Sequence, residues 1–179
     1  EADPEAWWGD IVDAVRQVRA ATGVNPKSIR AVAVSSFFPA VVPLAPDGSP
    51  VRPAIMYNDQ RSVVQVESLV RRFGRERIEG RIGNTLGPGT SAVTSIRWLY
   101  ENEPEVVRTC SVFGFANTFV TSRLTGRGVT DASNSALSGL VDIRDPWHWS
   151  PKLCADFRVD MEKLPPVLEP SAVVGSLTS

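Results

Sequence analysis

The sequence predicts an α/β fold, in which helices and strands alternate along one chain. Apolar residues recur at three- and four-residue spacing in several segments, as in amphipathic helices, and short runs rich in Val, Ile and Ala separate these segments. At 179 residues and 42% hydrophobic composition, the chain is long enough for one domain with a single core. No internal repeat or low-complexity linker divides it, so we expect one α/β unit.

The first predicted element is an amphipathic helix that begins after Asp3 and ends at Gly23. Asp3 and Pro4 suit the N-cap and N1 positions of a helix. The apolar positions of this helix are Trp8, Ile11, Val12, Val15 and Val18.

A strand is expected next at "IRAVAVSS" (29–36), whose apolar residues fall on both faces, as in a strand covered on both sides.

A hairpin is expected after this strand. The segment "AVVPLAPDGSPVRPAIMY" contains two short strand-like runs around a turn at Asp47 and Gly48. Pro43 and Pro53 lack a backbone N–H, and they favour edge or irregular positions in a sheet.

Two helices are predicted in the middle of the chain. The first follows Asp59 and stops at Gly74, and the second, within "TSAVTSIRWLYENEPE", ends before Pro104. Their apolar positions are Val63, Val66, Val70 and Phe73 in the first and Val93, Ile96 and Leu99 in the second.

The last third again alternates strands and helices. "VFGFANTFVTSRLTG" predicts a brief strand and a helix from Asn117 to Gly126, and "LVDI" (140–143) predicts a strand. A helix follows with Ser150 as its cap and Pro151 at N1. The proline-rich "LPPVLEP" (164–170) is expected to be extended and stiff.

Composition narrows the function classes. The 19 basic and 20 acidic residues nearly cancel without runs of one sign, so nothing favours a nucleic-acid or membrane partner. No apolar run approaches the ~18 residues of a membrane span. Cys110 and Cys154 lie far apart and indicate two reduced, buried thiols, which favours a cytoplasmic location. The single His148 has no partner histidine, so we expect a packing role and neither a metal site nor a triad.

Known phosphate and nucleophile motifs are missing. "GNTLGPG" (83–89) is rich in glycine but lacks the lysine and hydroxyl residue of a P-loop, so a flexible loop is favoured over a phosphate site. Ser35 and Ser36 follow the predicted strand without a GxSxG turn, which favours strand-end polar groups over a nucleophile.

The most informative local cluster lies in "RPAIMYNDQRS" (52–62), which crowds Tyr57, Asn58, Asp59 and Arg61 between a strand and a helix. An aromatic ring beside a carboxylate and an amide can bind a sugar through its C–H face and its hydroxyls. The alternative is that Asp59 caps the following helix and Tyr57 packs in the core. Similarly, "TDASNSALSG" (130–139) favours a tight turn region.

The chain as a whole resembles the amino-terminal domain of the FGGY family of carbohydrate kinases. Successive blocks, including "IRAVAVSS", "PDGSPVRPAIMYNDQRS", "IRWLYENEPE", "FANTFVTSRLTG" and "VTDASNSALSGLVDI", follow the order of the family over essentially residues 1–179. The wording of "RPAIMYND" and "RLTG…TDAS" is most similar to xylulokinases. This resemblance implies a ribonuclease-H-like domain of the actin-like ATPase type, present here in part.

The resemblance also implies transfer of the γ-phosphate of ATP, with Mg²⁺, to a hydroxyl of a small sugar such as D-xylulose or a related ketose. The family's phosphate loop, in the first strands, would precede Glu1, and its catalytic Asp would lie beyond Ser179. We therefore expect residues 1–179 to be an internal part of the domain that holds no catalytic residue, metal, ATP or Mg²⁺ and that is inactive alone.

Six residues are implied in sugar binding. Tyr57 stands where the family commonly has Trp, and Asn58 and Asp59 match the family directly. Phe37, Phe38 and Pro39 depart from the Gln-Met-His type found in xylulokinases, and the missing His puts xylulose in doubt and leaves an apolar wall at Phe38 and Pro39. Thr90 lies near a position that contacts substrate in the glycerol-kinase branch.

Two rival functions stay open: a degenerate module that binds a sugar or a partner without catalysis, and an FGGY kinase for ribulose, gluconate or glycerol. In either case the expected partner is a small-molecule sugar. The strand at 29–36 would be left with an unpaired edge, which favours a homodimer.

Overall fold

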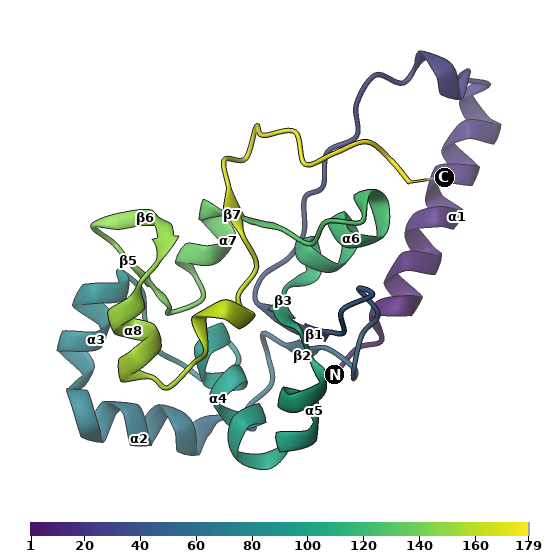
Figure 1. Cartoon of the computed structure of the whole chain (residues 1–179). Helices are drawn as coiled ribbons and strands as arrows, with labels where there is room; N and C mark the ends of the chain where they lie inside the picture. Colours follow the sequence, from purple (N-terminus) through teal and green to yellow (C-terminus); the bar gives the residue numbers. More distant parts are fainter. Residues whose placement is uncertain (179) are drawn as a thin grey trace.

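A computed structural model describes residues 1–178, and it confirms a mixed fold of helices and short strands (Figure 1). The helices are α1 (Pro4–Thr22), α2 (Val63–Phe73), α3 (Arg75–Ile82), α4 (Ala92–Asn102), α5 (Pro104–Thr109), α6 (Ala116–Thr125), α7 (Ala132–Ala136) and α8 (Pro151–Asp156), with 3₁₀ turns η1 (Pro26–Ser28) and η2 (Met161–Lys163). The strands are β1 (Ala40–Leu44), β2 (Ile55–Met56), β3 (Val112–Gly114), β4 (Thr130–Asp131), β5 (Val141–Asp142), β6 (Asp145–Trp149) and β7 (Val167–Leu168).

A three-stranded antiparallel sheet in the order β2-β1-β3 lies at the centre of the molecule. Successive residues of β1 face opposite sides because strand side chains alternate. Val41 packs in the larger core, formed with α2, α3, α4, α5 and α8, whereas Val42 and Leu44 pack in a smaller core with α6 and the start of α1. Helices therefore cover both faces of the sheet (Figure 1).

The ends of α1 and α8 follow the expected local chemistry. The Asp3 carboxylate accepts from the N–H of Glu5 at 2.9 Å, and Gly23 ends α1 with a left-handed φ of 64°. The Ser150 hydroxyl accepts from the N–H of Leu153 at 3.3 Å, with Pro151 as the first residue of α8. The helices predicted from periodicity are thus confirmed, although α3, α5 and α7 were not anticipated.

The strand expected at 29–36 is wrong. These residues are extended, but among residues 1–178 they pair with no strand and make no backbone ladder. Ile29 and Val32 are 48% and 57% exposed, and only the end of the segment, at Val34, packs against the smaller core, so the segment is not covered on both sides as expected. A strand requires a hydrogen-bonded neighbour, and apolar residues alone do not create one.

Pro43 corrects a second expectation, because it lies in the central strand of the sheet. It pairs with Phe113 of β3, and its carbonyl accepts from the N–H of Val51 at 2.9 Å. In an antiparallel strand the N and C=O of one residue face the same neighbour. The nitrogen of Pro43 therefore faces the β2 side of the sheet. Because β2 pairs only with Ala40 and Val41, no hydrogen bond between β1 and β2 is lost at Pro43.

His148 is not a packing residue, contrary to expectation. It lies on β6, its side chain is 76% exposed, and its Nδ1 is 2.8 Å from the Asp145 carboxylate. Both cysteines are free and buried, as expected, and burial raises the pKa of the Cys154 thiol to about 11. None of the described helices is long and apolar enough to cross a membrane.

Candidate functional site

One end of the central sheet gathers the sequence-predicted site residues. Because β1 is antiparallel to both neighbours, its first residue lies beside the last residues of β2 and β3. Ala40 pairs with Met56, so the segments 37–39 and 57–59 emerge side by side. Phe115 leaves β3 at the same end, since Gly114 pairs with Val42. The rim of the sheet is therefore formed by three chain segments.

Tyr57 and Asn58 form an exposed turn at this rim. The N–H of Asp59 donates to the carbonyl of Met56 at 3.0 Å, which reverses the chain after β2. Tyr57 is 50% exposed and Asn58 is also exposed. Tyr57 thus does not pack in the core, and that alternative is wrong. Among residues 1–178, no side-chain hydrogen bond involves either residue, so both polar tips remain available to a ligand.

Asp59 forms a fork with Arg61. One carboxylate oxygen, Oδ1, accepts from the backbone N–H and from Nε of Arg61, both at 2.9 Å, and Oδ2 accepts from a terminal guanidinium nitrogen at 2.8 Å. These bonds lower the pKa of Asp59 and keep it ionised. The N-cap of α2 is Ser62, so Asp59 is not the helix cap, and this second alternative is also wrong.

Arg61 anchors the turn to the rest of the molecule. Its guanidinium reaches a Glu1 oxygen at 2.6 Å and lies over the Trp98 ring at 4.8 Å. Glu1 also pairs with Arg52, which in turn pairs with Glu103. Sequence reasoning placed Arg61 in the cluster without a role. The signal was its two-residue spacing from Asp59, which permits a fork between neighbouring side chains.

The glycine-rich loop 83–89 packs directly against this turn. Gly89 has a left-handed φ of 68°, and a side chain there would put Cβ 2.6 Å from the Asp59 carbonyl and closer still to the Tyr57 carbonyl. This contact gives the loop a packing role. Thr90 follows immediately and is exposed, so the structure brings Thr90 next to the 57–59 turn.

Phe38 and Pro39 lie at the rim but turn inward. Phe38 meets Phe115 edge to face with ring centroids 4.9 Å apart, and Pro39 is buried. Phe37 is 44% exposed and rests against Trp7 at 5.3 Å. The apolar surface nearest the rim is therefore that of Phe37. The sequence comparison with xylulokinases touched Phe37 together with Phe38 and Pro39, but Phe37 was not among the predicted site residues; its exposure in the structure distinguishes it from the other two.

The hydroxyl-rich segment 130–139 forms β4 and the short helix α7 and is not only a turn region. Asp131 caps α7 by accepting from the N–H of Asn134 at 2.9 Å, and Asn117 donates to Asp131 at 3.1 Å. Asn117 is 6% exposed and closely follows β3, so this segment buttresses the rim through a buried amide.

The metal-binding potential and two pockets of the described residues can be compared with the rim. Within residues 1–178, no group of three or more His, Cys, Asp or Glu side chains is placed to hold a metal ion. Two pockets, of about 160 and about 400 Å³, lie along α2 and α3, and neither includes residues 57–59. Tyr57 and Asn58 therefore lie exposed at the rim, outside both of these pockets.

Comparison with known proteins places this arrangement in a family. The model described as "FGGY family of carbohydrate kinases, N-terminal domain" matches residues 1–179. A xylulose kinase from Streptomyces rubiginosus is 29% identical over 99% of the chain and 36% of its own length. A glycerol kinase from Thermococcus gammatolerans is 30% identical over 98% of the chain and 36% of its own length.

Solved structures agree in fold. A xylulose kinase structure from Brucella ovis, titled "xyloylose kinase", has a TM-score of 0.88 and 23% identity, covering 100% of this chain and 37% of its own. A gluconate kinase from Lactobacillus acidophilus has a TM-score of 0.84 and 22% identity, covering 99% and 35%.

The chain belongs to the FGGY family of carbohydrate kinases and corresponds to their N-terminal domain, with the actin-like ATPase fold. It spans about a third of the length of the curated relatives that it matches.

Proposed function

We propose that this chain supplies one wall of the sugar site of an ATP-dependent carbohydrate kinase that acts on D-xylulose or a related ketose. The observation that carries the proposal is the rim of the sheet, where an exposed ring, an amide and an ionised carboxylate follow one another at residues 57–59. A sugar presents C–H faces to rings and hydroxyls to polar groups, so these three side chains suit its two kinds of surface.

The carboxylate of Asp59 is suited to binding and less to proton transfer. A carboxylate offers about four acceptor sites, and Arg61 occupies three of them. One site on Oδ2 remains for a sugar hydroxyl. Because Arg61 lowers the pKa of Asp59, the group is a poor general base near neutral pH. We assign it to holding the sugar.

Phosphate transfer requires parts that we place elsewhere in a longer protein. The reaction needs MgATP, groups that position the phosphates, and a carboxylate that accepts the proton of the sugar hydroxyl. Within residues 1–178, no group of three or more His, Cys, Asp or Glu side chains could hold a metal ion by itself. We therefore propose that these 179 residues alone bind no nucleotide and transfer no phosphate.

The exact sugar depends on the segment 37–39. It carries no polar side chain, and Phe38 and Pro39 face the core, so any contact from this segment to a sugar is apolar and comes from Phe37. This feature supports two rivals: a kinase for ribulose, gluconate or glycerol, and a degenerate module that binds without catalysis. Turnover of a panel of sugars by the longer protein separates them.

Asn58→Ala is the sharpest test of the sugar wall. The side chain is exposed and makes no hydrogen bond among residues 1–178, so its removal should leave the fold intact. In the longer protein we expect the KM for the sugar to rise about tenfold, the equivalent of one lost hydrogen bond to a ligand. The KM for ATP should stay unchanged.

Gln60→Ala is the matched control, because Gln60 is an exposed amide two residues away that makes no side-chain hydrogen bond in the described chain. It should change neither KM. An unchanged sugar KM in Asn58→Ala would remove Asn58 from the site, and equal losses in both variants would show a general effect of the turn.

The extended segment 29–36 supports a proposal about assembly. It makes no backbone ladder within residues 1–178 and exposes Ile29 and Val32, so it can accept a strand from a second copy. We expect a homodimer by light scattering. A monomer at all concentrations would contradict it.

The two buried free thiols support a reducing, cytoplasmic location.

A further inference from the structure

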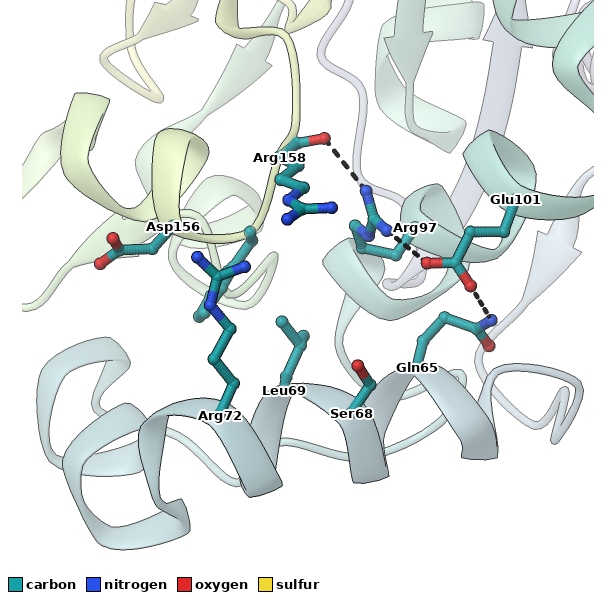
Figure 2. Close-up of a pocket in the computed structure, with 9 residues that line it drawn as sticks. Gln65, Ser68, Leu69, Arg72, Arg97, Glu101, Asp156 and Arg158 are labelled. Carbon is teal, nitrogen blue, oxygen red and sulfur yellow. Dashed lines mark hydrogen bonds and ion pairs between the residues drawn. The ribbon is translucent and has the colours of Figure 1, made fainter.

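A pocket with several arginines in its lining lies away from the sugar wall, between α2, α4 and the end of α8. It has a volume of about 160 Å³, many times the ~10–15 Å³ that one water requires. Its floor includes the buried Leu69 and Phe157. Three arginines, Arg72, Arg97 and Arg158, line its walls, and Figure 2 shows their guanidinium groups turned toward the same space.

The acidic residues of this pocket are already neutralised. Glu101 pairs with Arg97 and accepts from Gln65 Nε2 at 2.7 Å. Asp156 pairs with Lys152, with Nζ 3.1 Å from Oδ2. In the described part of the chain, neither Arg72 nor Arg158 has a carboxylate partner. Two guanidinium charges therefore remain uncompensated at the pocket.

The Arg72 side chain and the Arg158 backbone each make a contact that is not an ion pair. The Arg72 guanidinium lies 4.8 Å from the centroid of the Phe73 ring, which leaves its N–H edge free. Arg158 has a φ of 54° and is the one non-glycine residue with a positive φ among residues 1–178. Its carbonyl accepts from Arg97 at 3.4 Å, which ties the arginine-bearing turn to α4.

The conformation of Arg158 is informative because glycine is usual there. The turn after α8 closes through Arg158 N–H to Ala155 and Val159 N–H to Cys154, a helix end that a left-handed residue makes possible. An arginine destabilises this conformation relative to glycine. The positive φ of Arg158 is therefore an outlier that supports a role for its side chain in the pocket.

We infer that this pocket binds a phosphate dianion, either free phosphate or the phosphate group of a small phosphorylated metabolite. A compact dianion matches two uncompensated guanidinium groups that converge on one space, and each planar fork can bind two phosphate oxygens. A dicarboxylate would separate its two charges and fit the single space less well. None of residues 57–59 lines the pocket, so this inference stands apart from the sugar wall.

Titration calorimetry with inorganic phosphate at low ionic strength tests the pocket on this chain. Arg72→Gln and Arg158→Gly should each weaken phosphate binding about tenfold, the loss expected for a hydrogen bond to a charged group. Arg16→Gln is the matched control, because it removes the same charge from an exposed position on α1. It should change the affinity by less than about twofold.

Thermal unfolding separates binding from folding in the same variants. Arg158→Gly should unfold at an equal or higher temperature than the parent chain, since glycine suits the positive φ. Arg72 is exposed on α2, so its replacement by glutamine keeps the fold and tests the pocket by itself.

Three results would overturn the inference: no phosphate binding by the parent chain, equal losses in Arg16→Gln and Arg72→Gln, or tighter binding of malonate than of phosphate. Competition by glucose 6-phosphate, but not by glucose, would identify a phosphorylated metabolite as the source, whereas competition by neither would identify free phosphate.

Discussion

Two turns of this molecule share one local structure and differ in what surrounds them. In each, an aspartate is followed two residues later by an arginine that donates its backbone N–H, Nε and a terminal nitrogen to the carboxylate: Asp59 with Arg61, and Asp142 with Arg144. Asp142 also accepts from Arg81 of α3 at 2.8 Å. All four acceptor sites of Asp142 are thus used, whereas Asp59 keeps one free.

The two-residue spacing between Asp and Arg is sufficient to form the fork in both turns. Whether the carboxylate can also bind a ligand depends on the residues that surround it. The turn at Asp142 connects β5 to β6 and is tied to α3 through Arg81, so its carboxylate supports the fold. The unsaturated turn stands at the rim of the central sheet with an open acceptor. An Asp-x-Arg pattern alone therefore indicates a stable turn, and the function of Asp59 rests on its position.

The loop 83–89 connects these two turns. Gly83 and Gly89 have nearly equal φ values of 67° and 68°, and each sits against one turn. A Cβ on Gly83 would lie 2.5 Å from Cδ1 of Ile143, the flexible end of a side chain. A Cβ on Gly89 would meet the rigid carbonyls of Tyr57 and Asp59.

The largest expected effect comes from Gly89→Ala. The left-handed backbone costs about 1–2 kcal/mol with an alanine, and the overlap with two backbone oxygens adds to it, so we expect a loss of about 3 kcal/mol or more in the free energy of unfolding. Urea denaturation of the chain measures this. In the longer protein, the displaced 57–59 turn should also raise the sugar KM.

Gly83→Ala is the matched variant, with the same φ but a neighbour that can rotate away. It should cost only about 1–2 kcal/mol and leave the sugar KM unchanged. Equal losses in the two variants would show that backbone strain alone matters and that the loop does not support the rim specifically.

The next effect compares the two carboxylates. Asp59→Asn should raise the sugar KM about tenfold or more, because a charged acceptor for a hydroxyl is replaced by a neutral one. Asp142→Asn should leave the KM unchanged and lower the free energy of unfolding by about 1–3 kcal/mol, since two arginines lose their partner.

Steady-state kinetics and urea denaturation on both variants separate the roles. A rise in the sugar KM for Asp142→Asn similar to that for Asp59→Asn would remove the distinction between the turns.

The smallest effect is on acid stability. Arg61 lowers the pKa of Asp59, and Arg144, followed by Arg81, lowers that of Asp142. A group with a lowered pKa stabilises the fold above its unfolded pKa, near 4, and this stabilisation is lost as the pH falls through the folded pKa. The free energy of unfolding should therefore decline below about pH 4.

Both asparagine variants should flatten this acid decline, and Asp142→Asn should flatten it more because two arginines act on that carboxylate. An unchanged pH profile in Asp142→Asn would mean that the fork contributes little to the fold.

Helix prediction succeeded where local chemistry decides the outcome and failed to say what covers each helix. Both α1 and α4 have apolar residues at helical spacing. Yet Val93 and Leu99 of α4 are fully buried, whereas Val15 and Val18 of α1 are 57% and 59% exposed. Periodicity reports a face that can be buried, and only the tertiary arrangement shows whether something packs on it.

The candidate site was found in part for the same reason. Tyr57, Asn58 and Asp59 could be identified because their chemistry is contiguous in the sequence. Gly89 contacts their backbone from a position about thirty residues away, and no local sequence pattern predicts this contact. The inward turn of Phe38 onto Phe115 likewise depends on how β1 and β3 pair.

The sequence by itself determined the ends of α1 and α8, the hairpin and the family, because each depends on residues close together in the chain or on an ordered series of such blocks. The tertiary structure alone decided that Pro43 lies in the central strand, that 29–36 has no strand partner in the described chain, and that Asp142 is saturated while Asp59 is not. These outcomes depend on hydrogen-bond partners brought from distant segments, and the pairing of distant segments is a property of the packed chain.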